Sequence, residues 1–406
     1  MRKEDRLMDL LGRLDDSFLV DLDDEVSTVL KEKRKKTVGE AIWFQGASLA
    51  AAAVLTLIIA RTSLLPEVNV PPFDSTLPIL HMDYERLFAG GWGYEGLMGK
   101  NIEEIHYDAP WESGDFDTLP VFQNAMGSKS ETYTMEEKLL RMKKALLSAG
   151  ERVGVVIQEE EILVEWIQED YPIVSYESEE HTISVNPDLS ARVGFKTPYI
   201  VPEELRSKEE PFIEQDSSMV YPTLKENLRL SEYFAETYGD LVMMNHPEMA
   251  VEGGDRNIYG KRYYHVFFYE GSVDPKEKFL NYFFRRIYFN AMDMEELSSI
   301  GVFQTDLSEK AGEYPIISER EARDLLVKGN YVTSVPETFP GRKYIRRVEL
   351  VYRTGYDEEF FMPYYRILVE VPALKYEGMN TFGAYYVPAV RAEYLSGLPT
   401  YDGSFN

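Results

Sequence analysis

The sequence of 406 residues contains no cysteine. Without thiols the chain cannot form disulfides, zinc–thiolate sites or iron–sulfur clusters, and it has no thiol nucleophile or lipidated N-terminal cysteine. Basic residues are also few, because 43 Lys and Arg stand against 70 Asp and Glu, which gives a net charge of -27. Nucleic-acid binding requires clustered Lys and Arg to neutralise phosphates, so nucleic acid is not expected as a partner.

Catalytic motifs are equally scarce. The glycines of residues 91–96 satisfy G-x-G-x-x-G, but Trp92 and Glu95 stand where a pyrophosphate would need space and positive charge. The five histidines show neither H-x-x-x-H nor H-E-x-x-H spacing. We therefore expect no metal ion, no cofactor and no enzymatic activity.

One segment, residues 41–61, predicts a transmembrane helix. Its first twenty residues, Ala41 to Ala60, carry no charge, and at about 1.5 Å per residue they span roughly 30 Å, the thickness of a bilayer's hydrocarbon core. Basic residues cluster just before it at 31–36 and are sparse after Arg61. This asymmetry predicts a single-pass protein of the cell membrane, with a cytoplasmic N-terminus and an extracellular C-terminal domain. A cleaved signal peptide and a buried Ala-rich helix are the alternatives.

Small residues recur at four-residue spacing within this segment, as in Gly46 and Ala50. Such spacing allows two transmembrane helices to pack closely, so a homodimer formed through the transmembrane helix is one expectation. Alanine richness alone explains the pattern equally well.

The arm before the span, residues 1–40, shows helical spacing of apolar residues. These residues are Leu7, Leu10, Leu11, Leu14, Leu19, Leu22 and Val26. Forty residues cannot bury two amphipathic faces by themselves, so we expect them to dock a cytoplasmic partner. A helix on the membrane surface, or one paired with its own copy, is the alternative.

The arm also carries a family resemblance. Residues 12–16 read Gly-x-x-Asp-Asp, and acidic residues, a Lys/Arg cluster and a single span follow. This order resembles the leader of single-pass proteins of Gram-positive gut bacteria that are similar to anti-sigma factors. The resemblance implies a cytoplasmic sigma factor or sensor protein as partner. The arm lacks the His and Cys of the zinc-binding anti-sigma type.

Beyond the span, residues 62–120 are a spacer rich in Pro and aromatic residues, and three capping boxes follow. They are Thr134 with Glu137, Thr223 with Glu226, and Ser318 with Glu321, and the helices that they open are expected to stop at Gly150, Gly239 and Gly329. Strand-like runs follow each helix. These runs are 153–157, 162–167, 182–185 and 191–195, then 262–269, 281–289 and 299–304, and finally 348–352, 365–371 and 384–387.

Helix followed by strands, three times, predicts an α+β ectodomain of tandem modules, each a helix on an antiparallel sheet. The expected modules are residues 121–210, 211–312 and 313–406. One larger α+β domain is the alternative.

The third module bears a second resemblance. Residues 314–318, Glu321 with Ala322, residues 348–352 and residues 363–365 resemble the repeat of PepSY-like and YycH/YycI-type extracytoplasmic proteins. The resemblance implies a regulator or inhibitor that works through protein contacts, and it carries over no catalytic residue.

Aromatic residues in Gly- and Pro-containing sequence are the candidate ligand contacts. Trp92, Tyr94 and Trp111 are expected to stack on sugar or peptide, whereas residues 361–365 and Tyr385 with Tyr386 are expected to lie in the core. The acidic ectodomain would attract a basic extracytoplasmic protein or peptide. The sequence thus predicts a membrane-bound regulatory or sensory protein. A membrane-anchored envelope enzyme, either a hydrolase or a glycan-active protein, and a passive protease-inhibiting or structural module are the alternatives.

Overall fold

The computed structural model describes residues 74–82, 84, 95–128, 130–168, 170–214, 217–291 and 294–401. The chain divides into two units, Met1–Val70 and Pro71–Asn406, and every described residue belongs to the second. The predicted arm, the predicted transmembrane helix at 41–61, and Trp92 with Tyr94 lie outside the described residues. Among the residues that are described, no helix combines the length and the apolar character needed to cross a bilayer.

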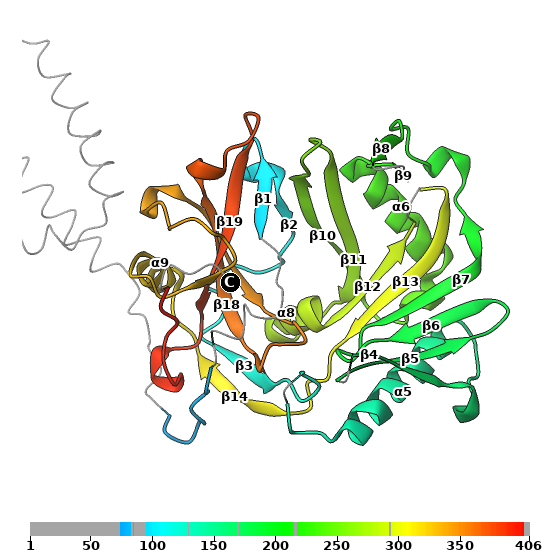
Figure 1. The fold of residues 1–406 in the computed structure, drawn as a ribbon, viewed down its shortest axis with the longest axis horizontal. Helices are drawn as coiled ribbons and strands as arrows, with labels where there is room; N and C mark the ends of the chain where they lie inside the picture. Colours follow the sequence, from blue (N-terminus) through cyan, green and yellow to red (C-terminus); the bar gives the residue numbers. More distant parts are fainter. Residues whose placement is uncertain are drawn as a thin grey trace, which may run out of the picture. The chain divides into compact units, whose positions relative to one another are not determined.

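The described region is an α+β fold of antiparallel sheets and helices (Figure 1), so the α+β class predicted from the sequence is confirmed for it. Its α-helices are α5 (Met135–Arg152), α6 (Leu224–Thr237), α7 (Gly239–Val242), α8 (Pro275–Phe284) and α9 (Glu319–Val327). Short 3₁₀ helices lie between the strands, and they are η1 (Ile102–Glu104), η2 (Glu159–Glu161), η3 (Glu203–Leu205), η4 (Arg342–Tyr344), η5 (Pro372–Leu374) and η6 (Ala392–Tyr394).

The largest sheet in the described region has nine antiparallel strands. In spatial order they are β2 (His106–Tyr107), β10 (Pro247–Arg256), β11 (Arg262–Glu270), β12 (Arg285–Asn290), β13 (Glu296–Gln304), β7 (Ala191–Ile200), β6 (His181–Val185), β5 (Tyr171–Glu177) and β4 (Leu163–Gln168). Strand β4 therefore stands at one edge of this sheet and β2 at the other.

Three smaller sheets complete the described fold. One contains β1 (Gly96–Gly99), β19 (Asn380–Pro388), β18 (Pro363–Glu370) and β16 (Ile345–Tyr352), with β15 (Val332–Thr333) also paired to β19. A second contains β14 (Lys310–Pro315), β3 (Thr118–Gln123) and β17 (Phe360–Phe361), and a third pairs β8 (Phe212–Glu214) with β9 (Ser217–Met219).

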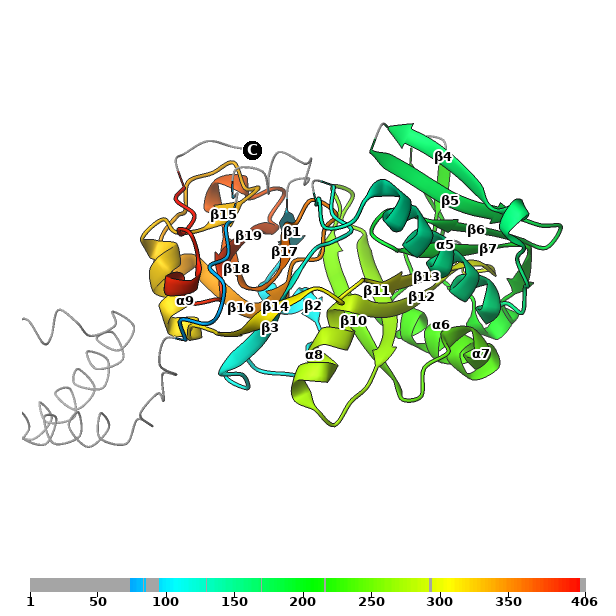
Figure 2. The same cartoon turned by 90° about the horizontal axis from the view of Figure 1, so that it is seen from below.

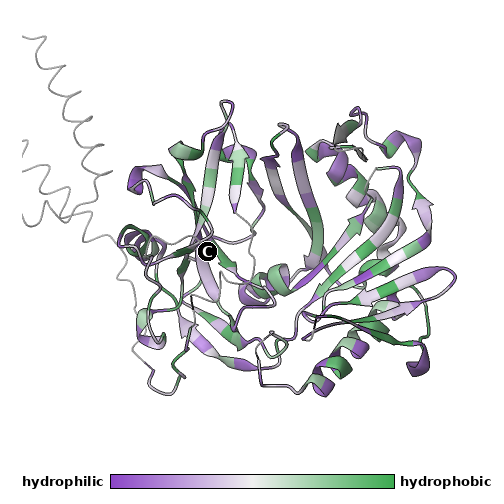
Figure 3. Ribbon diagram, viewed as in Figure 1, coloured by the Kyte–Doolittle hydropathy of each residue, from purple (hydrophilic) through white to green (hydrophobic). Residues whose placement is uncertain are grey.

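Helices cover both faces of the nine-stranded sheet, which Figure 2 shows from a second side. Apolar and polar positions alternate along many strands (Figure 3), because successive side chains of a strand point to opposite faces. In β11, Phe268 joins the core that α5 and α6 form with the sheet. Its neighbours Phe267 and Tyr269 pack instead with Tyr282 of α8. The sheet is thus the middle layer of this part of the fold.

Helix α9 packs on the smaller sheet that contains β18 and β19. Its Ala322 and Leu326 are fully buried in a core with Ile367 and Val387. The aromatic residues predicted to lie in the core are buried as expected, and they are Phe361, Tyr364, Tyr365, Tyr385 and Tyr386.

The three predicted helix starts are confirmed. Thr134, Thr223 and Ser318 are the N-caps of α5, α6 and α9, and each forms a complete capping box with the Glu three residues later. The side chain of each cap accepts a hydrogen bond from a backbone N–H that the helix leaves unpaired. Local sequence therefore fixes where these helices begin.

The predicted glycine stops are correct at two of three positions. Gly329 follows α9 with a φ of 87°, a left-handed conformation that favours glycine. Gly150 lies inside α5, where a side chain would come within 2.8 Å of Ile157, so its small size permits close packing. Helix α6 ends at Thr237 with Tyr238 as its C-cap, so Gly239 directly follows it, and the separate short helix α7 begins there.

The strand predictions are confirmed where apolar residues alternate cleanly. The hairpin of β6 and β7 forms as expected, with Thr182 opposite Gly194 and Val185 opposite Ala191. Residues 153–157 are not a strand, and the first part of the predicted strand at 281–289 belongs to α8. Strands β5 and β10 were not predicted.

Strand pairing crosses the predicted module boundaries. The nine-stranded sheet contains strands from both residues 121–210 and residues 211–312. Strand β3, which begins in the predicted spacer, pairs with β14, which spans the boundary at 312/313. The predicted modules therefore do not form separate sheets.

Candidate functional site

Trp111, a predicted ligand contact, is packed among aromatic side chains of this chain. Its ring meets Phe279 and Tyr282 edge to face, with centroids 4.5 Å and 4.8 Å apart. The indole N–H donates a hydrogen bond to the carbonyl oxygen of Leu350 at 3.3 Å. The half-buried indole joins its segment to α8 and β16. Stacking on a ligand stays a prediction for Trp111, as it does for Trp92 and Tyr94.

The most exposed apolar element of the described region is β4, at the edge of the nine-stranded sheet. All six of its residues are exposed, and Leu163, Trp166 and Ile167 expose 60%, 46% and 55% of their surface. The sequence predicted a strand at these residues. It did not predict that the strand would lie at an edge with its apolar side chains in solvent.

The register with β5 explains why β4 presents apolar groups on both faces. Val164 and Trp166 lie opposite Val174 and Pro172, so their side chains lie on the same face of the sheet as those of these two residues. Helix α5 covers this face at the neighbouring strands β5, β6 and β7. Leu163 and Ile167 point to the other face. An edge strand also presents unpaired backbone N–H and C=O groups, which can pair with another chain.

Acidic residues surround this strand. Residues 159–170 contain six acidic and no basic residues. Glu159 forms an ion pair with Lys143 of α5 at 3.5 Å, and Glu165 stands in the strand itself. The β4 edge, defined here as residues 159–168, is therefore both apolar and negatively charged.

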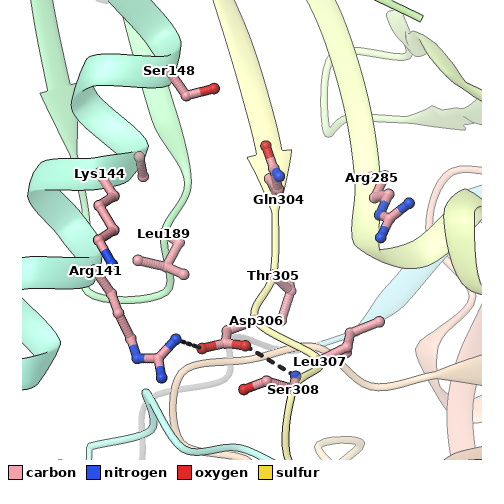
Figure 4. A pocket seen from close by; sticks show the side chains of 11 residues that line it. Arg141, Lys144, Ser148, Leu189, Arg285, Gln304, Thr305, Asp306, Leu307 and Ser308 are labelled. Carbon is pink, nitrogen blue, oxygen red and sulfur yellow. Dashed lines mark hydrogen bonds and ion pairs between the residues drawn. The ribbon is translucent and has the colours of Figure 1, made fainter. Parts of the chain in front are cut away.

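A second candidate site is a cavity of about 430 Å³ between α5 and the ends of β12 and β13 (Figure 4). Helix α5 contributes Arg141, Lys144, Ala145 and Ser148, and the strand ends and their loops contribute Leu189, Arg285, Gln304, Thr305, Asp306, Leu307 and Ser308. Three cationic side chains and one carboxylate thus line it, although the whole chain is strongly acidic.

The carboxylate of Asp306 is held by groups of the protein. Its Oδ2 pairs with Nη1 of Arg141 at 2.7 Å, and its Oδ1 accepts a hydrogen bond from the N–H of Ser308 at 3.0 Å. The Arg141 guanidinium also lies 3.9 Å from the ring centroid of Tyr133. Arg141 is therefore fixed at the rim of the cavity, as Figure 4 shows.

Lys144 and Arg285 differ from Arg141, because both are exposed and neither side chain has an ion-pair or hydrogen-bond partner among the described residues. They come from α5 and from the start of β12, and Gln304 and Thr305 lie between them in Figure 4. The sequence analysis missed this cavity. Its residues are spread over positions 141 to 308 and show no motif spacing.

Two further charged clusters of the described region are buried or half-buried, and each contains an Arg–Glu ion pair. Glu252 binds Arg286 through both oxygens at 3.0 Å and 3.2 Å, and Glu349 lies 2.6 Å from Arg366. Burial by itself raises the pKa of Glu252, but Arg286 and Arg366 outweigh it and hold the pKa below its usual value. Each of these two ion pairs lies within one sheet, because Glu252 and Arg286 belong to β10 and β12, and Glu349 and Arg366 belong to β16 and β18.

No three His, Asp or Glu side chains of the described residues converge on a point that would suit a metal ion. His265 lies between the rings of Tyr263 and Tyr288, and burial lowers its pKa. It therefore packs in the protein as a largely neutral aromatic side chain.

The sequence matches no family model and no curated protein. The two candidate sites therefore rest on geometry and charge alone. The β4 edge exposes apolar side chains, and the cavity beside α5 is lined by three cationic side chains and one carboxylate.

Proposed function

We propose that the chain is a single-pass membrane protein with a regulatory or sensory function, whose described region lies outside the cell and binds an extended segment of a basic protein or peptide. The uncharged residues 41–60, with basic residues before them, support the membrane topology. The observation that carries the binding function is the exposed apolar edge strand β4.

Addition of a strand suits this edge. A peptide that pairs with β4 would satisfy the open backbone groups of the strand and bury apolar side chains on both faces of the sheet. Burying a large apolar side chain contributes about 1.5 to 3 kcal/mol. Leu163, Trp166 and Ile167 therefore offer enough apolar surface for specific binding.

The charge of the edge selects the partner. Two β4 edges paired with each other would bring their acidic residues together, which disfavours a second copy of this chain as the occupant. Lys or Arg in a bound peptide would instead lie near Glu160, Glu161 and Glu165. We therefore assign the edge to a basic extracytoplasmic polypeptide.

The remaining parts of the proposal rest on the sequence. The arm of residues 1–40 docks a cytoplasmic sigma factor or sensor protein, and the protein acts by binding rather than by catalysis. The resemblance of residues 313–406 to PepSY-like proteins supports this role. The tandem-module interpretation also stays a proposal, in which each capping-box helix and its following strands form one repeat of a joined fold.

Peptide binding tests the β4 edge. The full-length protein in detergent is titrated into a labelled ten-residue peptide of alternating Lys and Val, and fluorescence anisotropy is measured. We expect binding of this peptide and none of the same peptide with Glu in place of Lys. Trp166→Ser and Ile167→Ser should each weaken binding about tenfold, since each removes buried apolar surface.

Leu140→Ser is the matched control, because Leu140 is also an exposed apolar residue but lies on α5. It should leave peptide binding unchanged. Equal binding of the Lys and Glu peptides, or an equal loss in the Leu140 and Trp166 variants, would show that β4 is not the binding surface.

A crosslinking pull-down from the native membrane tests the arm. Full-length protein is compared with protein that starts near Lys31. Recovery of a sigma factor or sensor protein only with the arm present supports the regulatory function. Recovery of the same envelope proteins with both versions, and of no cytoplasmic regulator, would reduce the arm to a membrane anchor.

A further inference from the structure

The nine-stranded sheet has a second face, opposite the one that α5 and α6 cover. Strands β12, β13, β7 and β6 lie side by side in it (Figure 1), and Ile287 and Val193 point into the core with the two helices. Because side chains alternate along a strand, Tyr288, Gly301 and Arg192 lie on the second face. The register places Gly301 between the other two, with Tyr288 opposite it on β12 and Arg192 opposite it on β7.

Two glycines let neighbouring side chains lie along this face instead of standing away from it. A side chain at Gly301 would overlap the ring of Tyr288, and one at Gly194 would come within 2.5 Å of the Thr182 hydroxyl. The Tyr288 ring therefore extends across β13, and the Thr182 hydroxyl extends across β7. Glycine inside a strand often marks a place that a ligand approaches closely. The face is thus low enough between β12 and β6 for a ring-shaped ligand to lie on it.

Four aromatic rings form a strip that crosses β11, β12 and β13 on the same face. Tyr263, His265, Tyr288 and Phe303 follow one another, with ring centroids 6.0 Å, 5.3 Å and 6.0 Å apart. Tyr263 and Phe303 expose 60% and 40% of their surface, and the two rings between them are half-buried. Aromatic rings offer an apolar surface on which the C–H face of a sugar can stack. A strip of several rings suits a chain of sugars.

Arg192 is a positioned cation beside the Tyr288 ring. Its Nε donates a hydrogen bond to Oγ of Ser299 at 3.2 Å, and Nδ2 of Asn290 donates to the same oxygen at 3.3 Å. The Arg192 side chain is exposed, and no carboxylate of the described residues forms an ion pair with it. Because Ser299 holds Nε, the two terminal amino groups are left to a ligand. Two such groups can bind both oxygens of a carboxylate.

The neighbouring charges on this face are already neutralised. Lys196 of β7 pairs with Glu177 at 2.6 Å, and Arg286 of β12 pairs with Glu252 at 3.0 Å. Arg192 therefore adds one uncompensated positive charge to a surface of rings, hydroxyl groups and amides. The complement of this surface is a ligand with an apolar face, hydroxyl groups and a negative charge.

We propose that this face binds a glycan whose sugars carry carboxylates. One sugar stacks on Tyr288 and directs its carboxylate to Arg192. The two side chains are neighbours, because the Tyr288 ring lies over Gly301 and Arg192 is directly opposite Gly301, and opposed side chains of a sheet are about 5 Å apart. Asn290 and Thr182 bind hydroxyl groups at the edge of the sugar.

A polypeptide is the other class of ligand that could contact rings and an arginine. Strands β12, β13, β7 and β6 each have a neighbouring strand on both sides, so a peptide cannot be added to them as a further strand. It would have to bind through side chains alone, whereas an acidic sugar matches the rings, the neutral polar groups and Arg192 together. This face is also separate from the β4 edge, because the two share no residue.

Isothermal titration calorimetry on the full-length protein in detergent tests the proposal. The ligands are hexamers of glucuronate, galacturonate and mannuronate, and each is compared at equal ionic strength with its neutral methyl ester. We expect at least one acidic hexamer to bind tenfold or more tightly than its ester. Binding of none of the three, or equal binding of acid and ester, would overturn the proposal. Tighter binding of a ten-residue peptide of alternating Glu and Val would overturn it in favour of a polypeptide.

Variants separate the two contacts. Arg192→Gln should weaken binding of the acidic hexamer about tenfold and leave binding of the ester unchanged. Tyr288→Leu should weaken binding of both, because it removes the ring and keeps an apolar side chain, and its circular dichroism spectrum should match that of the wild type.

Arg229→Gln is the matched control, because Arg229 is exposed on α6, at the other face of the sheet. Its substitution changes the net charge by the same amount as Arg192→Gln and should change affinity less than twofold. An equal loss in the Arg192 and Arg229 variants would mean that overall charge attracts the glycan, and it would overturn the site.

Discussion

Glu104 provides a sharp test of how the N-terminal part of the described region is held to the nine-stranded sheet. Glu104 is the last residue of η1. Its carboxylate accepts hydrogen bonds from the Lys100 N–H at 3.0 Å and from Nε and Nη2 of Arg256, each at 3.1 Å. It also forms an ion pair with Arg262. The two arginines stand at either end of the β10–β11 turn, so one carboxylate ties η1 to this hairpin. Glu104→Gln removes the charge and keeps the size.

The expected loss follows from the pKa. The hydrogen bond from the Arg256 side chain is the largest cause that lowers the pKa of Glu104 from 4.5 to about 2, and the side chain is only 14% exposed. Each pKa unit corresponds to about 1.4 kcal/mol, so the ionised carboxylate contributes about 3 kcal/mol to the free energy of unfolding. Because the folded pKa is depressed, this contribution is present above about pH 4.5 and is lost as the pH falls through about 2.

Urea unfolding of the full-length protein, followed by tryptophan fluorescence from pH 7 to pH 3, measures this loss. Glu104→Gln should lower the free energy of unfolding by about 3 kcal/mol at pH 7 and by about 1 kcal/mol at pH 3. Glu103→Gln is the control, because Glu103 is exposed on the same 3₁₀ helix. A loss that stays constant between pH 7 and pH 3, or a Glu103 variant equally destabilised, would refute the reasoning.

Two further predictions concern local backbone features. Gly254 has a φ of 86°, and a side chain there would lie 2.5 Å from the Glu104 carbonyl oxygen, whereas Gly260, with a φ of 73°, faces open space. Gly254→Ala should therefore cost about 3 kcal/mol or more in urea unfolding and Gly260→Ala about 1 kcal/mol, and equal losses would contradict the packing argument. Thr223→Ala and Ser318→Ala should each cost about 1 kcal/mol by the same measurement, and a neutral effect would mean that the caps contribute nothing.

The helix starts were predictable because their signals are local. Each capping box needs only four consecutive residues, and the structure places α5, α6 and α9 directly after Thr134, Thr223 and Ser318. Helix α8 had a comparable signal that the sequence analysis did not use. Asp274 caps it and Pro275 is its first residue, but the aromatic residues that follow were interpreted as a strand.

The strands that were missed have physical reasons. Strand β10 contains Gly253 and Gly254, both with positive φ, and its register with β11 shifts between Gly253 and Arg256. Such a bulge interrupts the alternation that identifies a strand. Sheet order was not predictable either, because β13 pairs with β7 across about one hundred residues, and no local pattern encodes that partner.

The candidate sites were harder to predict than the core. Residues 162–167 were predicted as a strand, but a sequence does not show which strand ends a sheet. Arg141 and Lys144 are ordinary polar positions of an amphipathic helix, and Arg285 is more than 130 residues away in the chain. Their convergence depends on the packing of α5 against the sheet and on the pairing of β12 with β13.

Helix α5 lies next to both candidate sites. Its buried face, with Met142, Leu146 and Ala149, packs on strands β5, β6 and β7. Lys143 on one side of the helix pairs with Glu159 next to β4, and Lys144 on another side lines the cavity. Because the core depends on the apolar face alone, exposed residues such as Trp166 and Lys144 are not needed to hold the layer together. The exposed Lys144 should tolerate substitution with a change of no more than about 0.5 kcal/mol in the free energy of unfolding. Trp166 has more than half of its surface covered, so Trp166→Ser should cost about 1 to 2 kcal/mol, and its peptide binding has to be measured on protein shown to be folded.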